Sequence, residues 1–298
     1  MRHLRYFVVV AEEQNVTRAA ERLHLSQPPL SRQIRDLEEE LGVELFRRTA
    51  KSLALTEAGK IFLAEARAVL LRAEQAVQTV SAMAKGERGH LRVGYAPSLT
   101  VEFLPRALKL FEPENLGVKI SLHDLSTEEC TQRLKGRKLD VALIVRPLGR
   151  ALRGLTFEKV AEYPFYVAVA VSHPFARKRL VSPAQLKNER LMAYNREDYP
   201  EQAELLQQLF APYGFEPQLA DECDSATSLI AAVEAGRGVA LVASSMRCLA
   251  GPRLKFLPLK PKLPPITVGA LFLKPAGRWV EPFIAAAKKA AASSAIKW

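Results

Sequence analysis

Hydrophobic residues recur with a helical period at the start of the chain. The spacing i, i+3, i+4, i+7 occurs within residues 4–11 and again within residues 16–23, which predicts two short amphipathic helices. A third helix is predicted to begin after Ser26, a residue that can cap it, and to run to about Leu41, where Gly42 is a natural stop. Three helices joined by short connections therefore open the chain.

The third helix is predicted to have two different faces. Its apolar stripe consists of Leu30, Ile34, Leu37 and Leu41, and its opposite face carries Pro28, Ser31, Arg32 and Arg35. A helix with such a face can enter the major groove of DNA, where arginine and glutamine side chains reach base edges. Any packed three-helix unit shows the same periodicity, so the spacing alone does not choose between a DNA reader and a packing unit.

A heptad pattern follows from Phe62 onward. One seam position holds Phe62, Val69, Ala76 and Met83, and the other holds Ala66, Ala73 and Val80. This pattern predicts a long helix that pairs with a second helix through an alanine-rich seam. The alternative is a single helix packed on its own domain. Residues 85–89, Lys-Gly-Glu-Arg-Gly, end the pattern and are interpreted as a hinge.

Apolar runs of strand length alternate with helical stretches through the rest of the chain. The first set comprises residues 91–95, 118–122 and 141–145, the second set comprises 166–171, 191–194 and 239–242, and residues 266–273 resemble a return strand. Strands that alternate with helices predict a mostly parallel sheet. We expect two α/β lobes with a cleft between them.

Length and charge limit the classes of protein to consider. A chain of 298 residues is too long for one typical core and suits a small domain plus a larger one. The net charge of +11 favours an anionic partner such as nucleic acid. The first sixty residues, however, hold ten Lys and Arg against nine Asp and Glu. The DNA-binding hypothesis therefore depends on motif and on the placement of charge.

The sequence shows no sign of a membrane or secretory segment. The N-terminal apolar run, residues 7–11, is shorter than the core of a signal peptide. No apolar stretch approaches the roughly 18 residues that a membrane span needs. We therefore expect a cytoplasmic protein with no membrane partner.

Cysteine and histidine usage argues against metal and enzyme chemistry. Cys130, Cys223 and Cys248 are odd in number and lack metal-ligand spacing, as expected of reduced thiols in the cytosol; a redox-sensing role for one of them is the alternative. The five histidines show no metal spacing either, and there is no nucleophile elbow or phosphate-binding glycine loop. We expect no metal, no cofactor and no enzyme activity.

The N-terminal residues carry a resemblance to a known family. The run NVTRAAERLHLSQPPLSRQIRDLE at residues 15–38, followed by LFRRT at 45–49 and LTEAG at 55–59, closely resembles the winged helix-turn-helix of LysR-type transcriptional regulators. The resemblance implies these DNA-binding residues: Thr17, Gln27, Pro28, Pro29, Ser31, Arg32, Arg48 and Lys51. The family usually has Arg at the position of Lys51, so this chain would place a point charge on phosphate there and not a bidentate contact.

The resemblance continues more weakly through the rest of the chain. It implies a winged helix-turn-helix at residues 1–58, a linker and dimerisation helix with a hinge at 59–88, and a two-lobed effector domain at 89–298, built like a periplasmic binding protein. Lobe I would comprise about 89–162 and 267–298, and lobe II about 163–266. The linker would pair with that of a second subunit through Phe62, Val69, Ala73, Ala76 and Val80.

Ligands in open α/β sheets bind at the carboxyl ends of strands, near helix N-termini. The sequence offers three such places, at Ser98 and Thr100, at the predicted capping box from Ser126 to Glu129, and at residues 224–227. Together with the family's cleft positions they give these candidate effector contacts: Ser98, Leu99, Thr100, Thr127, Arg146, Asn195 and Thr227. Each polar residue at a helix start can instead be a simple cap, and Arg146 can instead form an exposed salt bridge.

The implied function is regulation of transcription by a small molecule. Gln27-Pro28-Pro29 together with Ser98, Thr127 and Arg146 looks most like the branch that controls aromatic-compound breakdown, whose effectors are often small aromatic or dicarboxylic acids. The implied partners are double-stranded promoter DNA, RNA polymerase, the effector, and further copies of the chain in a homodimer or homotetramer. The alternatives are a DNA-compacting protein with no ligand and an enzyme.

Overall fold

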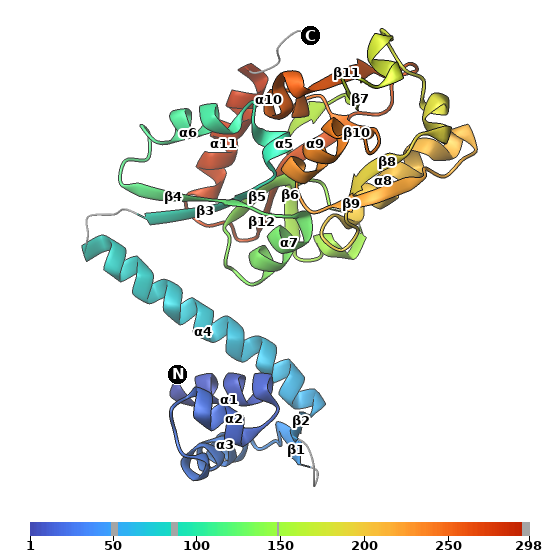
Figure 1. The fold of residues 1–298 in the computed structure, drawn as a ribbon. Coiled ribbons are helices and arrows are strands. Elements are labelled where there is room, and N and C mark those ends of the chain that lie inside the picture. Colours follow the sequence, from blue (N-terminus) through green and yellow to red (C-terminus); the bar gives the residue numbers. More distant parts are fainter. Residues whose placement is uncertain (49–52, 85–88, 148, 294–298) are drawn as a thin grey trace. The chain divides into compact units, whose positions relative to one another are not determined.

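The computed structural model describes residues 1–48, 53–84, 89–147 and 149–293 (Figure 1). Contacts within the chain divide it into two compact units, Met1–Gly86 and Glu87–Trp298. Each unit has hydrophobic clusters of its own. The chain thus forms a smaller and a larger compact unit.

The first unit is a helical bundle with a small β-hairpin and a long final helix. Its elements are α1 (Arg2–Glu13), α2 (Val16–Arg22), α3 (Gln27–Leu41), β1 (Phe46–Arg48), β2 (Leu53–Leu55) and α4 (Glu57–Ala84). Asn15 caps α2 by accepting hydrogen bonds from the backbone N–H groups of Thr17 and Arg18. Gly42 ends α3 in the left-handed region at φ 66°, as predicted. The strands β1 and β2 are antiparallel and form the wing.

Two residues of this unit, Phe62 and Leu41, do not lie where the sequence predicted. Phe62, predicted to lie in the dimer seam, packs against the unit's own core, with its ring 5.1 Å from that of Phe7. The heptad pattern did not reveal this contact because the first turns of α4 lie along α1. Leu41, predicted to continue the apolar stripe of α3, is 41% exposed because the stripe outruns the helices that cover it.

The second unit begins with lobe I, a five-stranded sheet in the order β4-β3-β5-β12-β6. Its strands are β3 (Gly89–Tyr95), β4 (Val118–Asp124), β5 (Val141–Val145), β6 (Leu155–Tyr163) and β12 (Ile266–Leu273). Its helices are α5 (Pro97–Thr100), α6 (Leu104–Phe111), α7 (Thr127–Lys135) and α11 (Val280–Ser293). The helices α6 and α11 lie side by side on one face, with Phe111 and Phe283 in edge-to-face contact, and α7 covers the other face (Figure 1).

Coverage of both faces explains the unbroken apolar sequence of β5. Val141 and Leu143 belong to the cluster beneath α6 and α11, and Ala142 and Ile144 belong to the cluster beneath α7. A strand that is buried on both faces needs apolar residues at successive positions, not at alternate ones. This central strand ends at the cleft, where its last residue, Val145, is half-buried.

Lobe II follows with a separate set of strands and helices. They are β7 (Phe165–Ala170), β8 (Leu191–Tyr194), α8 (Pro200–Phe210), β9 (Leu219–Cys223), α9 (Ala226–Glu234), β10 (Ala240–Ala243), α10 (Met246–Ala250) and β11 (Leu254–Pro258). The described chain also has 3-10 turns at Gly149–Leu152, Pro174–Arg177, Pro183–Asn188, Ala211–Tyr213 and Gly251–Arg253. The sheets have the orders β10-β7-β11 and β8-β9, and a bridge between Leu191 and Val239 joins them.

The prediction of a mostly parallel sheet is only partly right. The strand β3 is parallel to β4 and β5, and β8 is parallel to β9. In contrast, β12 is antiparallel to β5 and β6, and β7 is antiparallel to β10 and β11. The strands β6, β7 and β12 carry the chain from one lobe into the other. They are therefore not part of the strand-helix-strand units from which parallel order was predicted.

Among the residues that the structure describes, no helix combines the length and the apolar character that a bilayer crossing requires.

Candidate functional site

The exposed face of α3 carries four of the eight residues that the sequence predicted to contact DNA. Gln27, Pro28, Pro29 and Arg32 are all exposed, and Thr17 is exposed at the start of α2. Together they form a solvent-exposed surface of the helix-turn-helix that does not pack against the hydrophobic core of the unit. Because the N-terminal part of a recognition helix reaches base edges, Gln27 in the first turn of α3 and Arg32 in the second have suitable positions for readout.

Ser31 departs from the prediction. Its side chain is buried, with only 7% of its surface exposed, and its hydroxyl accepts a hydrogen bond of 3.0 Å from the Nε2 of Gln27. The helical period puts Ser31 between the apolar stripe and the polar face of α3. In the folded unit its side chain lies on the buried side of the helix. Its position suits orientation of Gln27 better than direct contact with DNA.

Glutamate side chains hold the helices and the wing around this face. Arg22 bridges Glu12 and Glu13 at 3.0 Å each, which ties α2 to α1, and Arg67 of α4 pairs with the same Glu12 at 2.9 Å. The carboxylate of Glu38, at the far end of α3, accepts hydrogen bonds from the backbone N–H groups of Leu45 and Phe46. Glu38 thereby fixes the start of the wing relative to the recognition helix.

Other predicted contacts in the first unit can be placed only partly. Arg48 is the last residue of β1, at the tip of the wing, and Lys51 lies outside the described residues. On α4, Val69 is 48% exposed, Ala76 is exposed and Ala73 is half-buried. Val80 belongs to the same helix, and residues 85–88 of the predicted hinge at 85–89 lie outside the described residues.

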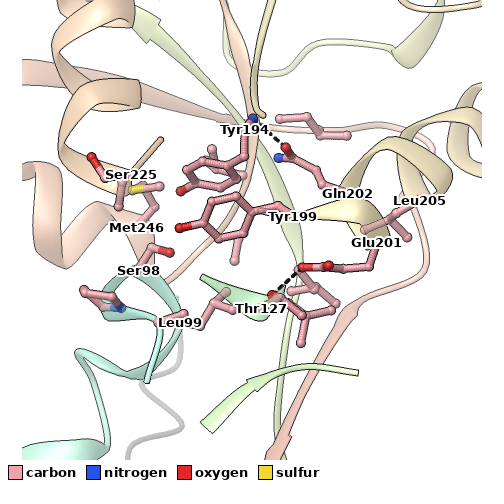
Figure 2. A pocket seen from close by; sticks show the side chains of 18 of the residues that line it. Ser98, Leu99, Thr127, Tyr194, Tyr199, Glu201, Gln202, Leu205, Ser225 and Met246 are labelled. Carbon is pink, nitrogen blue, oxygen red and sulfur yellow. Dashed lines mark hydrogen bonds between the residues drawn. The ribbon is translucent and has the colours of Figure 1, made fainter. Parts of the chain in front are cut away.

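A cavity lies between the two lobes of the second unit, and we call it the interlobe cavity (Figure 2). Lobe I supplies its wall from the carboxyl ends of β3, β4 and β5 and from the starts of α5 and α7. Lobe II supplies the end of β8, the start of α8 and the residues around the start of α9. The volume is about 80 Å³, which is room for a few water molecules or a small organic group.

Most of this wall is apolar. The apolar lining residues are Ala96, Pro97, Leu99, Val145, Phe165, Leu205, Leu206, Ala226, Leu241, Val242, Ala243, Met246 and Ile266. The polar lining residues are Ser98, Asp124, Thr127, Tyr194, Tyr199, Glu201, Gln202 and Ser225. Such a lining suits a ligand with an apolar body and one or two polar groups.

Two buried hydrogen bonds join the lobes at this cavity. The hydroxyl of Thr127, at the start of α7, donates to Oε1 of Glu201, at the start of α8, over 2.7 Å (Figure 2). The hydroxyl of Ser245 donates to the backbone oxygen of Ser98 over 2.6 Å. A ligand that enters here is therefore next to the bonds that set the relative position of the two lobes.

Glu201 is the buried titratable group of this wall. The residue has only 6% of its surface exposed. Burial raises the pKa of its carboxyl group, the hydrogen bond from Thr127 opposes this, and the nearby charge of Glu128 raises the pKa further. Its second oxygen, Oε2, has no hydrogen-bond partner among the described residues. At the rim, partial burial and the charge of Glu129 also raise the pKa of Asp124.

Two tyrosine rings form another part of the wall. The rings of Tyr194 and Tyr199 lie 4.6 Å apart between centroids, and Figure 2 shows both hydroxyls on the side of Ser98 and Ser225. Burial raises the pKa of both phenols, so both stay protonated and able to donate. The Tyr199 hydroxyl donates to the backbone oxygen of Asp224 over 3.3 Å, whereas the Tyr194 hydroxyl makes no hydrogen bond of good geometry with the described residues.

The structure brings together some of the predicted effector contacts and not others. Ser98, Leu99 and Thr127 line the interlobe cavity. Thr100 does not, because it is fully buried and its hydroxyl donates to the backbone oxygen of Ala96, one helical turn earlier. The predicted capping box at Ser126 and Glu129 is present and orients the turn that carries Thr127.

Three further predicted contacts lie away from the cavity wall. The exposed guanidinium of Arg146 lies over the ring of Phe157, at 5.8 Å. Asn195 uses its side chain in a local turn with Asp198. Thr227 is exposed and lies 3.1 Å from the hydroxyl of Ser225, which is the actual cap of α9. The prediction placed these residues correctly at strand and helix ends, but their side chains do not reach the cavity.

Cys130 and Cys248 do not have the surroundings of a reactive thiol. Cys130 and Cys223 are buried, and burial raises the pKa of Cys130 to about 12. Cys248 is exposed, but partial burial and the nearby Glu102 raise its pKa as well. Since the thiolate is the reactive form, these surroundings argue against a redox-sensing role for Cys130 or Cys248.

A helix-turn-helix unit joined to a two-lobed unit with a cavity between its lobes is the architecture of a DNA-binding protein with a ligand-binding domain. Two family models match the chain, "Bacterial regulatory helix-turn-helix protein, lysR family" at residues 1–60 and "LysR substrate binding domain" at residues 84–292. The chain therefore belongs to the LysR family of bacterial transcriptional regulators.

Similar proteins span nearly the same length. The transcriptional regulator AlsR of Bacillus subtilis is 34% identical over 249 residues, which cover 84% of this chain and 82% of AlsR. BenM of Acinetobacter baylyi is 32% identical over 87% of this chain and 85% of its own. The crystal structure of full-length CbnR in complex with its target DNA is similar with a TM-score of 0.69 at 29% identity, and 99% of each chain is covered.

Proposed function

We propose that this regulator senses a small organic molecule in the interlobe cavity and controls a neighbouring operon from promoter DNA. In this proposal residues 1–58 bind DNA in the bacterial cytoplasm, 59–88 join subunits of a homodimer or homotetramer, and 89–298 sense the effector. The observation that carries it is the position of the cavity, which lies between lobes joined directly by Thr127 and Glu201. The protein acts on RNA polymerase through binding and not through catalysis.

The mechanism follows from differential binding. The hydrogen bond from Thr127 to Glu201 and the one from Ser245 to Ser98 both cross between the lobes at the cavity. A ligand that replaces or reinforces these bonds favours one relative position of the lobes. Only a ligand with different affinities for the two arrangements can shift the equilibrium between them and so change the spacing of the recognition helices.

The experiment that tests this function is a binding assay with the DNA that flanks the gene. The purified protein is titrated with that DNA and with random DNA of the same length across a salt series. A sequence preference that persists as salt weakens the phosphate contacts supports a specific regulator. Equal and steeply salt-dependent binding to both DNAs supports a compacting protein instead.

A matched pair of variants assigns the recognition helix in the same assay. Arg32→Ala removes an exposed side chain of the α3 face, and Arg237→Ala removes an exposed arginine from the second unit. Loss of the sequence preference in the first variant alone, with unchanged thermal unfolding, supports readout by α3. Equal losses in both variants would show a charge effect with no specific readout.

The class of effector is a finer part of the proposal. The sequence pointed to an aromatic or dicarboxylic acid, and Arg146 was the residue expected to meet its charge. Among the described residues that line the interlobe cavity there is no Lys, Arg or His. An acid would have to be held there by neutral donors such as the hydroxyls of Ser98 and Tyr194.

A further inference from the structure

Among the described residues, the two charged side chains that line the interlobe cavity are both acidic. Asp124 and Glu201 line it, and among its described lining residues neither faces a cation. A carboxylate ligand would meet these two groups at close range, and like charges in a poorly hydrated site repel strongly. A ligand that carries a positive charge would instead be attracted by both carboxylates.

Glu201 has an unfilled position for a hydrogen-bond donor. Oε1 is taken by Thr127, and Oε2 has no partner among the described residues although the residue is 6% exposed. Leaving a buried carboxylate oxygen unpaired is costly. An ammonium group offers three donors and a full positive charge, so it would satisfy Oε2 and hold the carboxylate in its ionised form.

A second cavity is also lined by Glu201, and we call it the side cavity. Thr127 and Glu201 line both cavities, and the side cavity, of about 220 Å³, is otherwise lined by Glu128, Thr131, Pro147, Gly149, Pro200 and Glu204. The carboxylates of Glu128 and Glu204 accept hydrogen bonds from the amides of Gln132 and Gln208 and are not in ion pairs with described residues. The hydroxyl of Thr131, a residue only 3% exposed, is also without a partner among the described residues.

The rest of the interlobe cavity suits the body of an organic amine. Leu99 offers apolar surface near Thr127 and Leu205 offers it near Glu201, whereas Met246 lies near Ser225 (Figure 2). The paired rings of Tyr194 and Tyr199 add π-faces, which attract cations. An inorganic cation is a poorer fit, because no group of His, Cys, Asp and Glu among the described residues is arranged to hold a metal ion.

We infer that the interlobe cavity binds a small organic amine whose ammonium group pairs with Glu201, with its apolar body against Leu99 and Leu205. The inference rests on the proposed function, because it names the chemical class of the effector. It replaces the acid that the sequence suggested.

Three probes of equal size and different charge test the inference. n-Butylamine, 1-butanol and propionate are titrated into the full-length protein at neutral pH, and binding is followed by ligand-observed NMR. Because a hydrogen bond between an ammonium group and a carboxylate is stronger than one from a neutral hydroxyl, we expect n-butylamine to bind about tenfold or more tightly than 1-butanol. Propionate should bind most weakly. Tightest binding by propionate, or equal binding by the amine and the alcohol, would overturn the inference.

Two glutamate variants locate the charge. Glu201→Gln keeps the shape and the acceptor for Thr127, so it should lose the preference for n-butylamine while its affinity for 1-butanol changes little. Glu197→Gln removes the same charge from an exposed residue outside both cavities, and it should keep the preference. Equal loss of amine binding in both variants, or retention in Glu201→Gln, would contradict pairing with Glu201.

The failures of the two proposals can be told apart. If 1-butanol or propionate binds best and changes the affinity for the flanking DNA, the effector site stands and only the amine class is wrong. If none of the three probes binds, the amine assignment is overturned. The comparison of flanking with random DNA does not depend on these probes and decides the proposed function separately.

Discussion

Two threonines on the same helix should respond in opposite ways to the same substitution. Thr127 and Thr131 lie one turn apart on α7, and both are buried. The hydroxyl of Thr127 donates to Glu201, whereas that of Thr131 has no partner among the described residues. Replacement of either by valine keeps the shape of the side chain and removes only the hydroxyl.

The expected magnitudes differ in size and in sign. Thr127→Val removes a charge-assisted hydrogen bond of 2.7 Å and leaves the buried carboxylate without a donor. This should cost about 1.5–3 kcal/mol of unfolding free energy. For a unit of this size the melting temperature should fall by roughly 3–10 °C. Thr131→Val removes an unpaired buried hydroxyl and should be neutral, or stabilising by up to about 1 kcal/mol.

Differential scanning calorimetry of the full-length variants measures both effects. The loss in Thr127→Val should shrink as the pH falls, because protonation of Glu201 turns the bond into a neutral one that contributes about 0.5–1.5 kcal/mol. Equal shifts in the two variants would refute the reasoning, because the effect would then come from helix packing and not from the bond between the lobes. A pH-independent loss in Thr127→Val would show that Glu201 is not the acceptor.

Three more outcomes are expected. Burial raises the pKa of Glu201 above 4.5, so the contribution of its protonated form to the free energy of unfolding is complete below that pH and is lost as the pH rises through the raised pKa. Glu201→Gln should therefore stabilise the ligand-free protein at neutral pH. The melting temperature of this variant should fall less with rising pH than that of the unmodified protein. Gly59→Ala should cost about 2 kcal/mol or more and reduce DNA binding, because the added Cβ would collide with the backbone oxygen of Leu45 and the side chain of Leu55; unchanged thermal unfolding would contradict this. Val69→Glu should shift the protein toward the monomer in light scattering, since it puts a charge on the exposed face of α4; an unchanged mass would argue against a seam at this position.

The sequence predicted those elements whose surroundings are uniform along their length. The helices α1 to α3 bury one face, and β5 is covered on both faces, so their patterns are regular. The strands β6, β9 and β11 were not predicted. β6 carries charged residues among half-buried ones, and β11 ends in Pro258. Their place in a sheet depends on neighbours that are distant in the sequence.

The sequence predicted cavity-lining residues in lobe I and missed those in lobe II. Ser98 and Thr127 follow strands of lobe I, where the topology places ligands, and both line the cavity. Tyr199 and Glu201 were not singled out, because a tyrosine and a glutamate at a helix start are ordinary in a solvated loop. Glu201 becomes notable only when the fold buries it against Thr127, which is 74 positions earlier in the chain. A glutamate just after Pro200, at the first turn of a helix that follows a strand, was the local signal that could have drawn attention to it.

The position of β12 has a consequence for the order in which the protein can be made. This strand lies between β5 and β6 in the sheet of lobe I, yet it comes from residues 266–273, after the whole of lobe II. During synthesis lobe II is complete while the first lobe still lacks an inner strand. Premature termination before Ile266 would leave an intact helix-turn-helix with no finished sensor. Such a fragment could bind DNA but could not bind an effector. DNA binding is therefore coupled to effector binding only in chains that have been translated through the last strand.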